Sequence, residues 1–215
     1  MGKRSELALT ERERELLEAL ARCVRVFSVE QIRRTWWSTV QHGERAVLAR
    51  LRVLESNAYI NLDRALTHPE LPLRAPLIAW PGDGQTPDFG KVAYALKARW
   101  KDVPRAERIV TIAPGIAAQF GGYPSPPLRL DEITHDLHLA AVYLFYREHF
   151  PALARDWISE RVIRRTRPVR GGPIPDAMIR GASQRVIEFG GAYSKQRVRI
   201  FHAFCLARGF PYELW

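Results

Sequence analysis

Two short apolar segments in the last third of the chain constrain the fold most, because each is long enough for a strand and for little else. Residues 174–180 (IPDAMIR) and 184–189 (QRVIEF) flank a glycine-containing loop at residues 181–183. This pattern predicts a β-hairpin. If the loop has three residues, Asp176 and Glu188 lie directly opposite each other on one side of the sheet, with Cβ atoms ~5 Å apart. A four-residue loop would put them on opposite faces, because a slip of one residue inverts the alternation.

Two carboxylates at that distance repel each other unless a cation lies between them. The pair Asp176 and Glu188 is therefore a candidate metal site. The alternative is structural: Asp176 is a turn acid after a proline, and Glu188 is the ion-pair partner of Arg180 or Arg197. The residues around the hairpin leave both interpretations open.

The charge balance points to a polyanionic partner. Lys and Arg number 33 against 23 Asp and Glu, which gives a formal net charge of +10 and a pI near 10.1. Such a charge favours association with nucleic acid, although an arginine-rich proteome is the alternative explanation. Cys23 and Cys205 lie far apart without a C-x-x-C pattern, as expected of reduced thiols. No apolar run approaches the ~20 residues that cross a bilayer, so we expect a cytoplasmic, nucleoid-associated protein without a membrane partner.

The first hundred residues predict three helices followed by two strands. Thr10 is placed to cap a helix over residues 11–22, Ser28 to cap a short second helix, and residues 43–54 form a third. Two strands follow, at residues 59–62 and 76–80, with the tip of a wing at residues 66–74. A fourth helix begins at Thr86-Pro87 and packs on the first helix or at a dimer interface. This order predicts a winged helix-turn-helix domain.

In a winged helix the third helix enters the major groove and the wing lies along the DNA backbone. Side chains near the start of that helix are placed to read bases, and arginines further along it and on the wing are placed to bind phosphates. The predicted DNA-binding residues are Gln41, His42, Arg45, Arg50, Arg52, Arg64 and Arg74. The alternative is a winged helix that binds protein through a solvated basic helix.

The second half predicts a helix, three strands and a helix. Thr134 begins a helix that ends near residue 149, a strand covers residues 157–163, the hairpin follows, and Ser194 caps a helix that ends at Gly209. We therefore expect an α+β protein with a winged-helix domain at residues 1–104, a linker at 105–129 and a small α/β domain at 130–215. No P-loop, dinucleotide-binding glycine motif or Gly-x-Ser-x-Gly sequence occurs, which argues against nucleotide hydrolysis and esterase chemistry.

The order of short motifs in the second half resembles a known family. The motifs are His135-Asp136-Leu137, Trp157 with Ser159-Glu160, Pro175-Asp176-Ala177, and Glu188 ahead of a glycine. Together they span roughly residues 130–193 and resemble the replication-relaxation family of mobile-element proteins, in which a winged helix precedes a PD-(D/E)xK nuclease-like (restriction-endonuclease-like) domain. Family members typically carry a second acid two residues after the glutamate, and the nuclease motif has a lysine there. This chain has Gly190.

The resemblance implies a DNA-binding protein of a mobile element or plasmid that acts in replication, mobilisation or regulation, with a degenerate nuclease-like domain. The alternative is an active Mg²⁺-dependent endonuclease directed by its winged helix. In that case Asp176 and Glu188 bind Mg²⁺, Lys195 replaces the missing catalytic lysine, and Glu160 or Asp136 supplies a third acid. Double-stranded DNA is the expected partner. Protein partners from a mobile-element or defence complex, and a homodimer, stay open.

Overall fold

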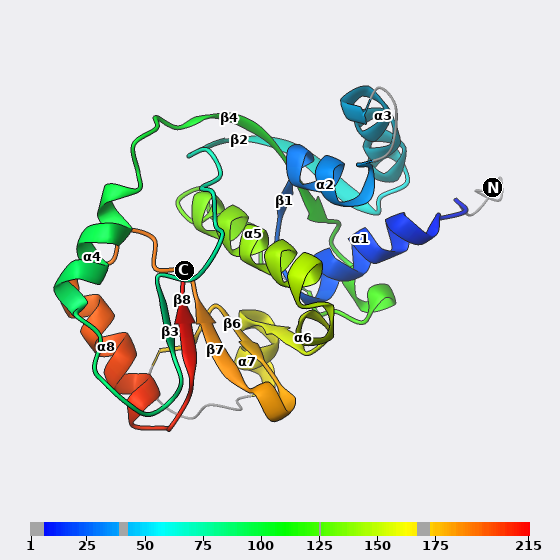
Figure 1. Cartoon of the computed structure of the whole chain (residues 1–215). Helices are drawn as coiled ribbons and strands as arrows, with labels where there is room; N and C mark the ends of the chain where they lie inside the picture. The colour runs from blue at the N-terminus through cyan, green and yellow to red at the C-terminus, as the bar shows by residue number, and fades with distance from the viewer. Residues whose placement is uncertain (1–6, 39–42, 125, 167–172) are drawn as a thin grey trace. The chain divides into compact units, whose positions relative to one another are not determined.

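The computed structural model describes residues 7–38, 43–124, 126–166 and 173–215 (Figure 1). These residues form an α+β fold with eight α-helices and two β-sheets, as the sequence predicts at this level. The chain divides into two compact units, and each unit consists of two separate segments. The first contains Met1–Ala65 and Glu107–Pro127, and the second contains Leu66–Ala106 and Leu128–Trp215. Among the residues just given, no helix combines the length and the apolar character that crossing a bilayer requires.

The first unit contains three helices and a three-stranded sheet. Its helices are α1 (Glu11–Arg22), α2 (Val29–Trp36) and α3 (Gly43–Ser56). Its strands are β1 (Phe27–Ser28), β2 (Ile60–Thr67) and β4 (Arg105–Ile112), in the order β1-β4-β2. Strand β1 runs antiparallel to β4, with Phe27 opposite Val110. The predicted bounds of α1 are confirmed, and α3 extends two residues beyond its predicted end.

Local capping explains where α1 and α2 begin. The Ser28 hydroxyl accepts a hydrogen bond from Gln31 N, and the Gln31 side chain accepts one from Ser28 N, both at 3.0 Å. At the start of α1 the Glu13 carboxylate accepts from Thr10 N at 2.8 Å. These reciprocal bonds satisfy backbone N–H groups that have no partner inside the helix. The predicted caps at Thr10 and Ser28 are therefore confirmed.

The core of the first unit is built from the apolar stripes of its helices. Fully buried side chains come from each of the three helices, and include Leu16, Leu20, Ile32, Val47, Leu51 and Leu54. Trp36 and Trp37 are also buried. After β4 a short 3-10 helix, η1 (Ala117–Phe120), packs against α1. It is followed by Gly122, where a Cβ atom would lie 2.0 Å from the carbonyl oxygen of Ala21, so only glycine allows this approach.

The predicted wing is wrong. Strand β2 pairs with β4, whereas β3 (Ile78–Trp80) belongs to the other sheet and pairs with β8 (Tyr212–Leu214). The physical reason is burial: Trp80 is 4% exposed and packs on Tyr212 in the core of the second unit. Strand β4 in turn supplies the buried Ile109 and Val110 to the first unit.

The predicted domain bounds need the same correction. Residues 66–106, expected within the winged-helix domain at 1–104, belong to the second unit. Residues 105–129, expected to be a linker, contain the central strand of the first sheet and η1. The long connection between β2 and β4 therefore carries β3 and α4 (Phe89–Ala98) into the second unit instead of closing a hairpin.

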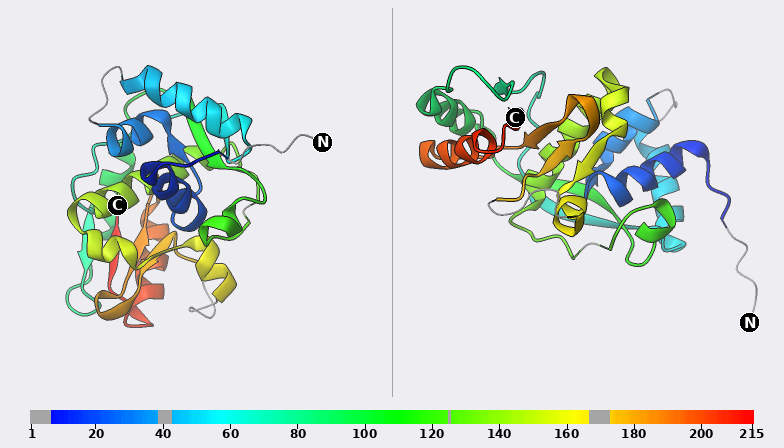
Figure 2. Two further views of the ribbon diagram at one scale, coloured as in Figure 1. Left: turned by 90° about the vertical axis from the view of Figure 1, so that its right-hand side faces the viewer. Right: turned by 90° about the horizontal axis from the view of Figure 1, so that it is seen from below.

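The second unit is built around a five-stranded sheet with the order β3-β8-β7-β6-β5. The other strands are β5 (Trp157–Ser159), β6 (Ala177–Ile179) and β7 (Arg185–Glu188). All neighbouring pairs are antiparallel except β7 and β8. The helices are α4, α5 (Ile133–His149), α6 (Pro151–Arg155), α7 (Glu160–Thr166) and α8 (Lys195–Leu206). Helices α4 and α8 lie side by side (Figures 1 and 2).

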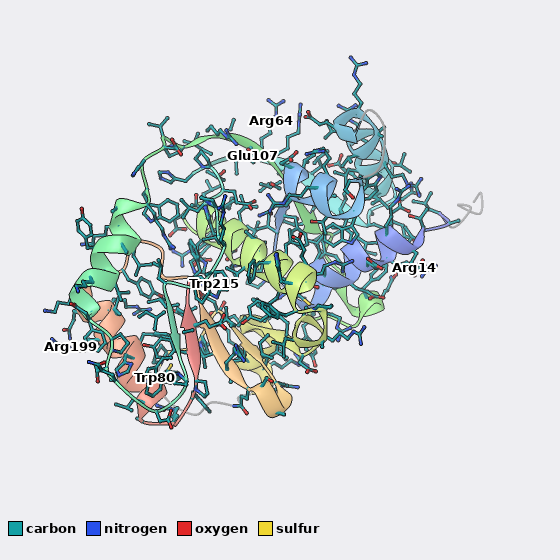
Figure 3. The ribbon with its side chains drawn as sticks, in the orientation of Figure 1. Arg14, Arg64, Trp80, Glu107, Arg199 and Trp215 are labelled. Atoms are coloured by element: carbon teal, nitrogen blue, oxygen red, sulfur yellow. The ribbon has the colours of Figure 1, made fainter. Side chains whose placement is uncertain are left out.

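Alternation along the strands gives the sheet two different faces. Met178, Val186 and Leu214 join one core cluster with Leu96 of α4 and Phe201 of α8. The buried Glu213 of β8 lies at the next position and faces the other way. Its carboxylate accepts hydrogen bonds from Tyr146 of α5 at 2.7 Å, Arg185 at 2.8 Å and Trp215 at 3.0 Å. Trp215, which donates to Glu213, is labelled in Figure 3, as is Trp80 of β3.

Two further predictions of secondary structure need correction. The strand predicted for residues 157–163 ends at Ser159, because α7 begins at Glu160. Helix α4 is capped by Asp88 rather than by Thr86: the Asp88 carboxylate accepts from Gly90 N at 2.9 Å and Lys91 N at 3.1 Å. This helix packs on α8 and not on the first helix of the chain.

Candidate functional site

The hairpin brings the two predicted acids together. Ala177 lies opposite Ile187 and Met178 opposite Val186, which puts Asp176 opposite Glu188. This is the register predicted for a loop of three residues. Asp176 N donates to Glu188 Oε2 at 3.3 Å, and the backbone N–H after Glu188, that of Phe189, donates to Asp176 Oδ2 at 2.8 Å. The two carboxyl groups therefore share one site at the end of the hairpin.

His135, from the first turn of α5, lies between the carboxyl groups of Asp176 and Asp136. His135 Nε2 lies 3.1 Å from Asp176 Oδ2, and His135 Nδ1 lies 3.5 Å from Asp136 Oδ1. Burial alone would lower the pKa of His135, but the charge of Asp176 and the contacts with both carboxylates raise that pKa well above its ordinary value. His135 is therefore an imidazolium near neutral pH, and its charge offsets that of the acids.

Glu188 is the most perturbed acid of the site. Its side chain is buried, and burial together with the charge of Asp176 raises the pKa of its carboxyl group. The Tyr193 hydroxyl donates to Glu188 Oε1 at 2.5 Å. Burial and the neighbouring Glu188 also raise the pKa of Tyr193, so its phenol is neutral and is not an activated nucleophile.

The basic residue next to the acids is Arg197 and not the predicted Lys195. The Arg197 guanidinium lies 5.2 Å from the centre of the Tyr193 ring. Its contact with Tyr193, and the charges of Glu188 and Asp176, raise the pKa of Arg197. Lys195 is exposed at the first position of α8. Both residues lie in the first turn of the helix that Ser194 caps. The charge of Lys195 acts on Asp88, whereas Arg197 contacts Tyr193 and acts on Glu188 and Asp176.

Gly190 occupies the position at which the nuclease motif has a lysine, and the packing there explains the glycine. A Cβ atom at Gly190 would lie 2.9 Å from a methyl group of Leu96 and 3.0 Å from one of Leu214. The residue is buried, and its N–H donates to Trp215 O at 3.0 Å. A lysine at this position would enter the apolar core between α4 and β8 rather than the acid site.

Neither candidate for a third acid completes a metal site. Glu160 begins α7, and its carboxylate pairs with Arg164 one turn later, with Arg164 Nε at 3.0 Å. Asp136 is buried on the far side of His135. Within residues 7–38, 43–124, 126–166 and 173–215, no group of three His, Cys, Asp or Glu side chains could hold a metal ion.

The acid pair as it stands does not fit a magnesium ion. Of the four oxygens of Asp176 and Glu188, three already accept hydrogen bonds from backbone N–H groups, His135 or Tyr193. Mg²⁺ requires near-octahedral oxygen coordination at about 2.1 Å, whereas these oxygens face protein donors. The protons held by His135 and Glu188 reduce the negative charge of the acid pair, as a bound cation would in a metal site. The magnesium ion therefore stays a prediction from the sequence.

An aromatic cluster closes the site from α5 and the segment after α4. The ring of His138 stacks on Phe189 with ring centres 5.0 Å apart, and Trp100 packs edge-on against His138 at 5.1 Å. Leu71 N donates to His138 Nε2 at 3.1 Å, and burial lowers the pKa of His138 to about 4. His138 is therefore neutral, its Nε2 accepts a hydrogen bond from the backbone, and the residue serves in packing.

The cluster also holds a partly buried cation. The Arg99 guanidinium lies 4.5 Å from the centre of the Phe189 ring and donates to the backbone oxygens of Gly191 and Trp215. Burial lowers the pKa of Arg99 to about 10. Sequence reasoning missed His135, Tyr193 and Arg99 as site residues. Of these, only His135 carried a signal, through its place in the His-Asp-Leu motif. Arg197 was predicted only as one of two alternative ion-pair partners of Glu188, and the structure places it over the Tyr193 ring.

Only some of the predicted DNA-binding residues are exposed on the first unit. Arg45 and Arg52 are exposed on α3, and Arg64 is exposed on β2. Arg50 pairs with the buried Glu13, whose second oxygen accepts from Arg50 Nη2 at 3.0 Å, so this arginine stabilises the first unit. Arg74 belongs to the second unit and is not part of a wing. Gln41 and His42 lie outside the described residues.

Comparison with known proteins adds no relative. No family model matches the chain, and neither a curated protein nor a solved structure matches it.

Proposed function

We propose that the chain is a DNA-binding protein whose first unit is a winged helix. The observation that carries this proposal is the order α1-β1-α2-α3-β2-β4 with the sheet order β1-β4-β2. A helix, a short strand, two helices and two longer strands in such a sheet are the arrangement of a winged helix, with α3 as its recognition helix. The segment 66–106 takes the place of the usual wing tip. The net charge of +10 agrees with a nucleic-acid partner.

The contacts with DNA are chiefly to phosphates. Arg45 and Arg52 project from the exposed side of α3, and the position between them on that side, Ala49, has no hydrogen-bonding side chain. Arginines without neighbouring base-reading side chains fix position on the duplex more than they read sequence. We therefore expect strong dependence on salt and modest dependence on sequence.

The second unit carries a nuclease-like arrangement in a form that does not cleave. A hairpin with facing Asp176 and Glu188, flanked by α5 and α8, supports the nuclease-like fold. The charges of His135 and Arg197 offset those of its acids, Tyr193 donates a hydrogen bond to Glu188, and Gly190 stands in place of the lysine. The resemblance to replication-relaxation proteins supports a role in replication, mobilisation or regulation on a plasmid or mobile element, at the nucleoid in the cytoplasm.

An active Mg²⁺-dependent endonuclease is the second candidate. One observation favours it: Asp176 and Glu188 face each other as they would in such an enzyme, with Arg197 beside them. Incubating supercoiled plasmid with the protein and Mg²⁺ or Mn²⁺ separates the two candidates. We expect intact plasmid. Cleavage that disappears in both Asp176→Asn and Glu188→Gln would establish the enzyme instead.

The DNA-binding proposal is tested by measuring the affinity for a duplex fragment across a salt series. Arg45, expected from the sequence to read bases, is proposed here as a phosphate contact together with Arg52. Arg45→Gln with Arg52→Gln removes both proposed contacts, so the slope of log affinity against log salt should fall by about 1.8. The matched control, Arg155→Gln with Arg180→Gln, removes the same charge from exposed positions of the second unit. The same loss of slope in both variants, or no change in either, would contradict a DNA-binding surface on α3.

A further inference from the structure

Two neighbouring helices of the second unit carry basic residues and no acidic ones. Helix α4 has the sequence FGKVAYALKA and α8 has KQRVRIFHAFCL, so neither contains Asp or Glu. Their exposed cations, which we call the cationic face, are Lys91, Lys97, Lys195, Arg197 and Arg199. A surface helix ordinarily intersperses both signs of charge, because opposite charges three or four residues apart stabilise it. Charge of one sign on both helices therefore points to a partner.

The packing of α4 on α8 makes these cations one surface. Leu96 of α4 and Phe201 of α8 point into the same core cluster, so the charged sides of both helices face outwards. Figures 1 and 2 show the two helices side by side, and in Figure 3 the labelled Arg199 lies on α8 at the edge of the unit. Within the described part of the chain, Lys97 and Arg199 form no ion pair.

An acid beside the cationic face is already engaged in capping α4. Asp88 uses its carboxylate to cap α4, through hydrogen bonds from Lys91 N and Gly90 N. These bonds, together with the charges of Lys91 and Lys195, hold the pKa of Asp88 below its ordinary value. Cations from both helices thus act on the same carboxylate, which shows that α4 and α8 contribute to one electrostatic surface.

The chemistry of this face fits the phosphates of a duplex. We propose that α4 and α8 form a second binding surface for double-stranded DNA, which contacts the backbone through Lys91, Lys97, Lys195 and Arg199. Exposed lysines and arginines over two adjacent helices match the spread of phosphates along a duplex. A track for single strands needs several stacking rings, whereas the only large exposed aromatic ring described on these two helices is Tyr94, at 76%.

This surface extends the proposed function to the second unit but uses different residues from α3. Arg197 connects it to the acid site, because the same side chain lies over Tyr193 and responds to Glu188 and Asp176. DNA on the cationic face would therefore pass the end of the hairpin. The role of the second unit becomes holding DNA at a site whose acids are neutralised.

The test is the salt dependence of DNA binding by the full chain. Lys97→Gln with Arg199→Gln should lower the slope of log affinity against log salt by about 1.8, because two phosphate contacts are lost. The control is again Arg155→Gln with Arg180→Gln, which removes the same charge outside α4 and α8 and should leave the slope unchanged. Equal urea midpoints for both variants would exclude unfolding as the cause of a loss.

The outcomes separate this inference from the proposed function. If Lys97→Gln with Arg199→Gln behaves like the control while the α3 variant loses slope, the cationic face is refuted and the DNA-binding first unit stands. If only the cationic-face variant loses slope, the inference stands and the role of α3 fails. Tighter binding to a single strand than to the duplex, abolished by Tyr94→Ala, would overturn the assignment to double-stranded DNA.

Discussion

The buried carboxyl group of Glu188 should make the stability of the protein depend on pH in a defined way. Burial and the charge of Asp176 raise the pKa of Glu188 above its value in the unfolded chain. Above about pH 4.3, the ordinary pKa of glutamate, the unfolded chain has therefore released a proton that the folded protein still holds. Stability contributed by this proton is complete below that pH and is lost as the pH rises towards the folded pKa.

The size of the effect follows from the number of protons. One extra proton bound by the folded state lowers the free energy of unfolding by about 1.4 kcal/mol for each unit of rising pH. Between about pH 5 and pH 7 the wild type should lose about 2.7 kcal/mol relative to Glu188→Gln, which does not titrate. The glutamine keeps an oxygen that can accept from the Tyr193 hydroxyl, so the packing of the site is retained.

Urea unfolding followed by tryptophan fluorescence at several pH values measures this difference. The raised pKa of His135 also makes stability fall as the pH increases through that pKa, and this contribution is present in both proteins because Asp176 and Asp136, which raise that pKa, are retained in Glu188→Gln. Tyr193→Phe is the control, because it alters the same site and leaves Glu188 in place, so its profile should keep the slope of the wild type. Parallel profiles for the wild type and Glu188→Gln would show that Glu188 is ionised in the folded protein, and would refute the reasoning.

Three further predictions concern packing and charge. Gly122→Ala should lower the free energy of unfolding by at least about 2 kcal/mol, measured in urea, because its Cβ would lie 2.0 Å from Ala21 O; no loss would mean that the turn is free to move away. Arg50→Met should cost about 3 kcal/mol because Glu13 is left buried without its cation, and adding Glu13→Gln should recover part of the loss; additive losses would contradict this. Gly190→Lys should lower the melting temperature and give no Mg²⁺-dependent cleavage of plasmid, because the side chain enters the core; a stable, cleaving variant would overturn that placement.

Helix starts could be predicted from the sequence because the interactions that fix them are local. Ser28 and Gln31 lie three residues apart and bond each other reciprocally, so the sequence around them suffices. The hairpin register is equally local, since the loop at residues 181–183 determines that Asp176 faces Glu188. Asp88 shows the limit of this reasoning: the sequence predicts the start of the helix at Thr86-Pro87, whereas the structure shows that the Asp88 carboxylate caps it.

Strand partners could not be predicted, because they depend on distant parts of the chain. Ile78 lies opposite Leu214, and nothing near either residue indicates the other. The same limitation hid His135, which α5 brings to Asp176, and it left the sequence unable to choose between Arg180 and Arg197 as the cation near Glu188. Charge and motif order indicated that acids would gather there, but which cations would meet them depends on the packing of separate helices on one sheet.

The interleaved order of the two units has a consequence for the order of folding during synthesis. The first sheet lacks its central strand, β4, until residue 112 has left the ribosome, and by then β3 and α4 of the second unit are already made. These two elements cannot yet pack into the second unit, because β3 pairs with β8 and Tyr212–Leu214 are synthesised only later. The nascent chain therefore completes its first unit around an unfinished insertion, and a fragment ending at residue 104 would lack the strand that joins β1 to β2.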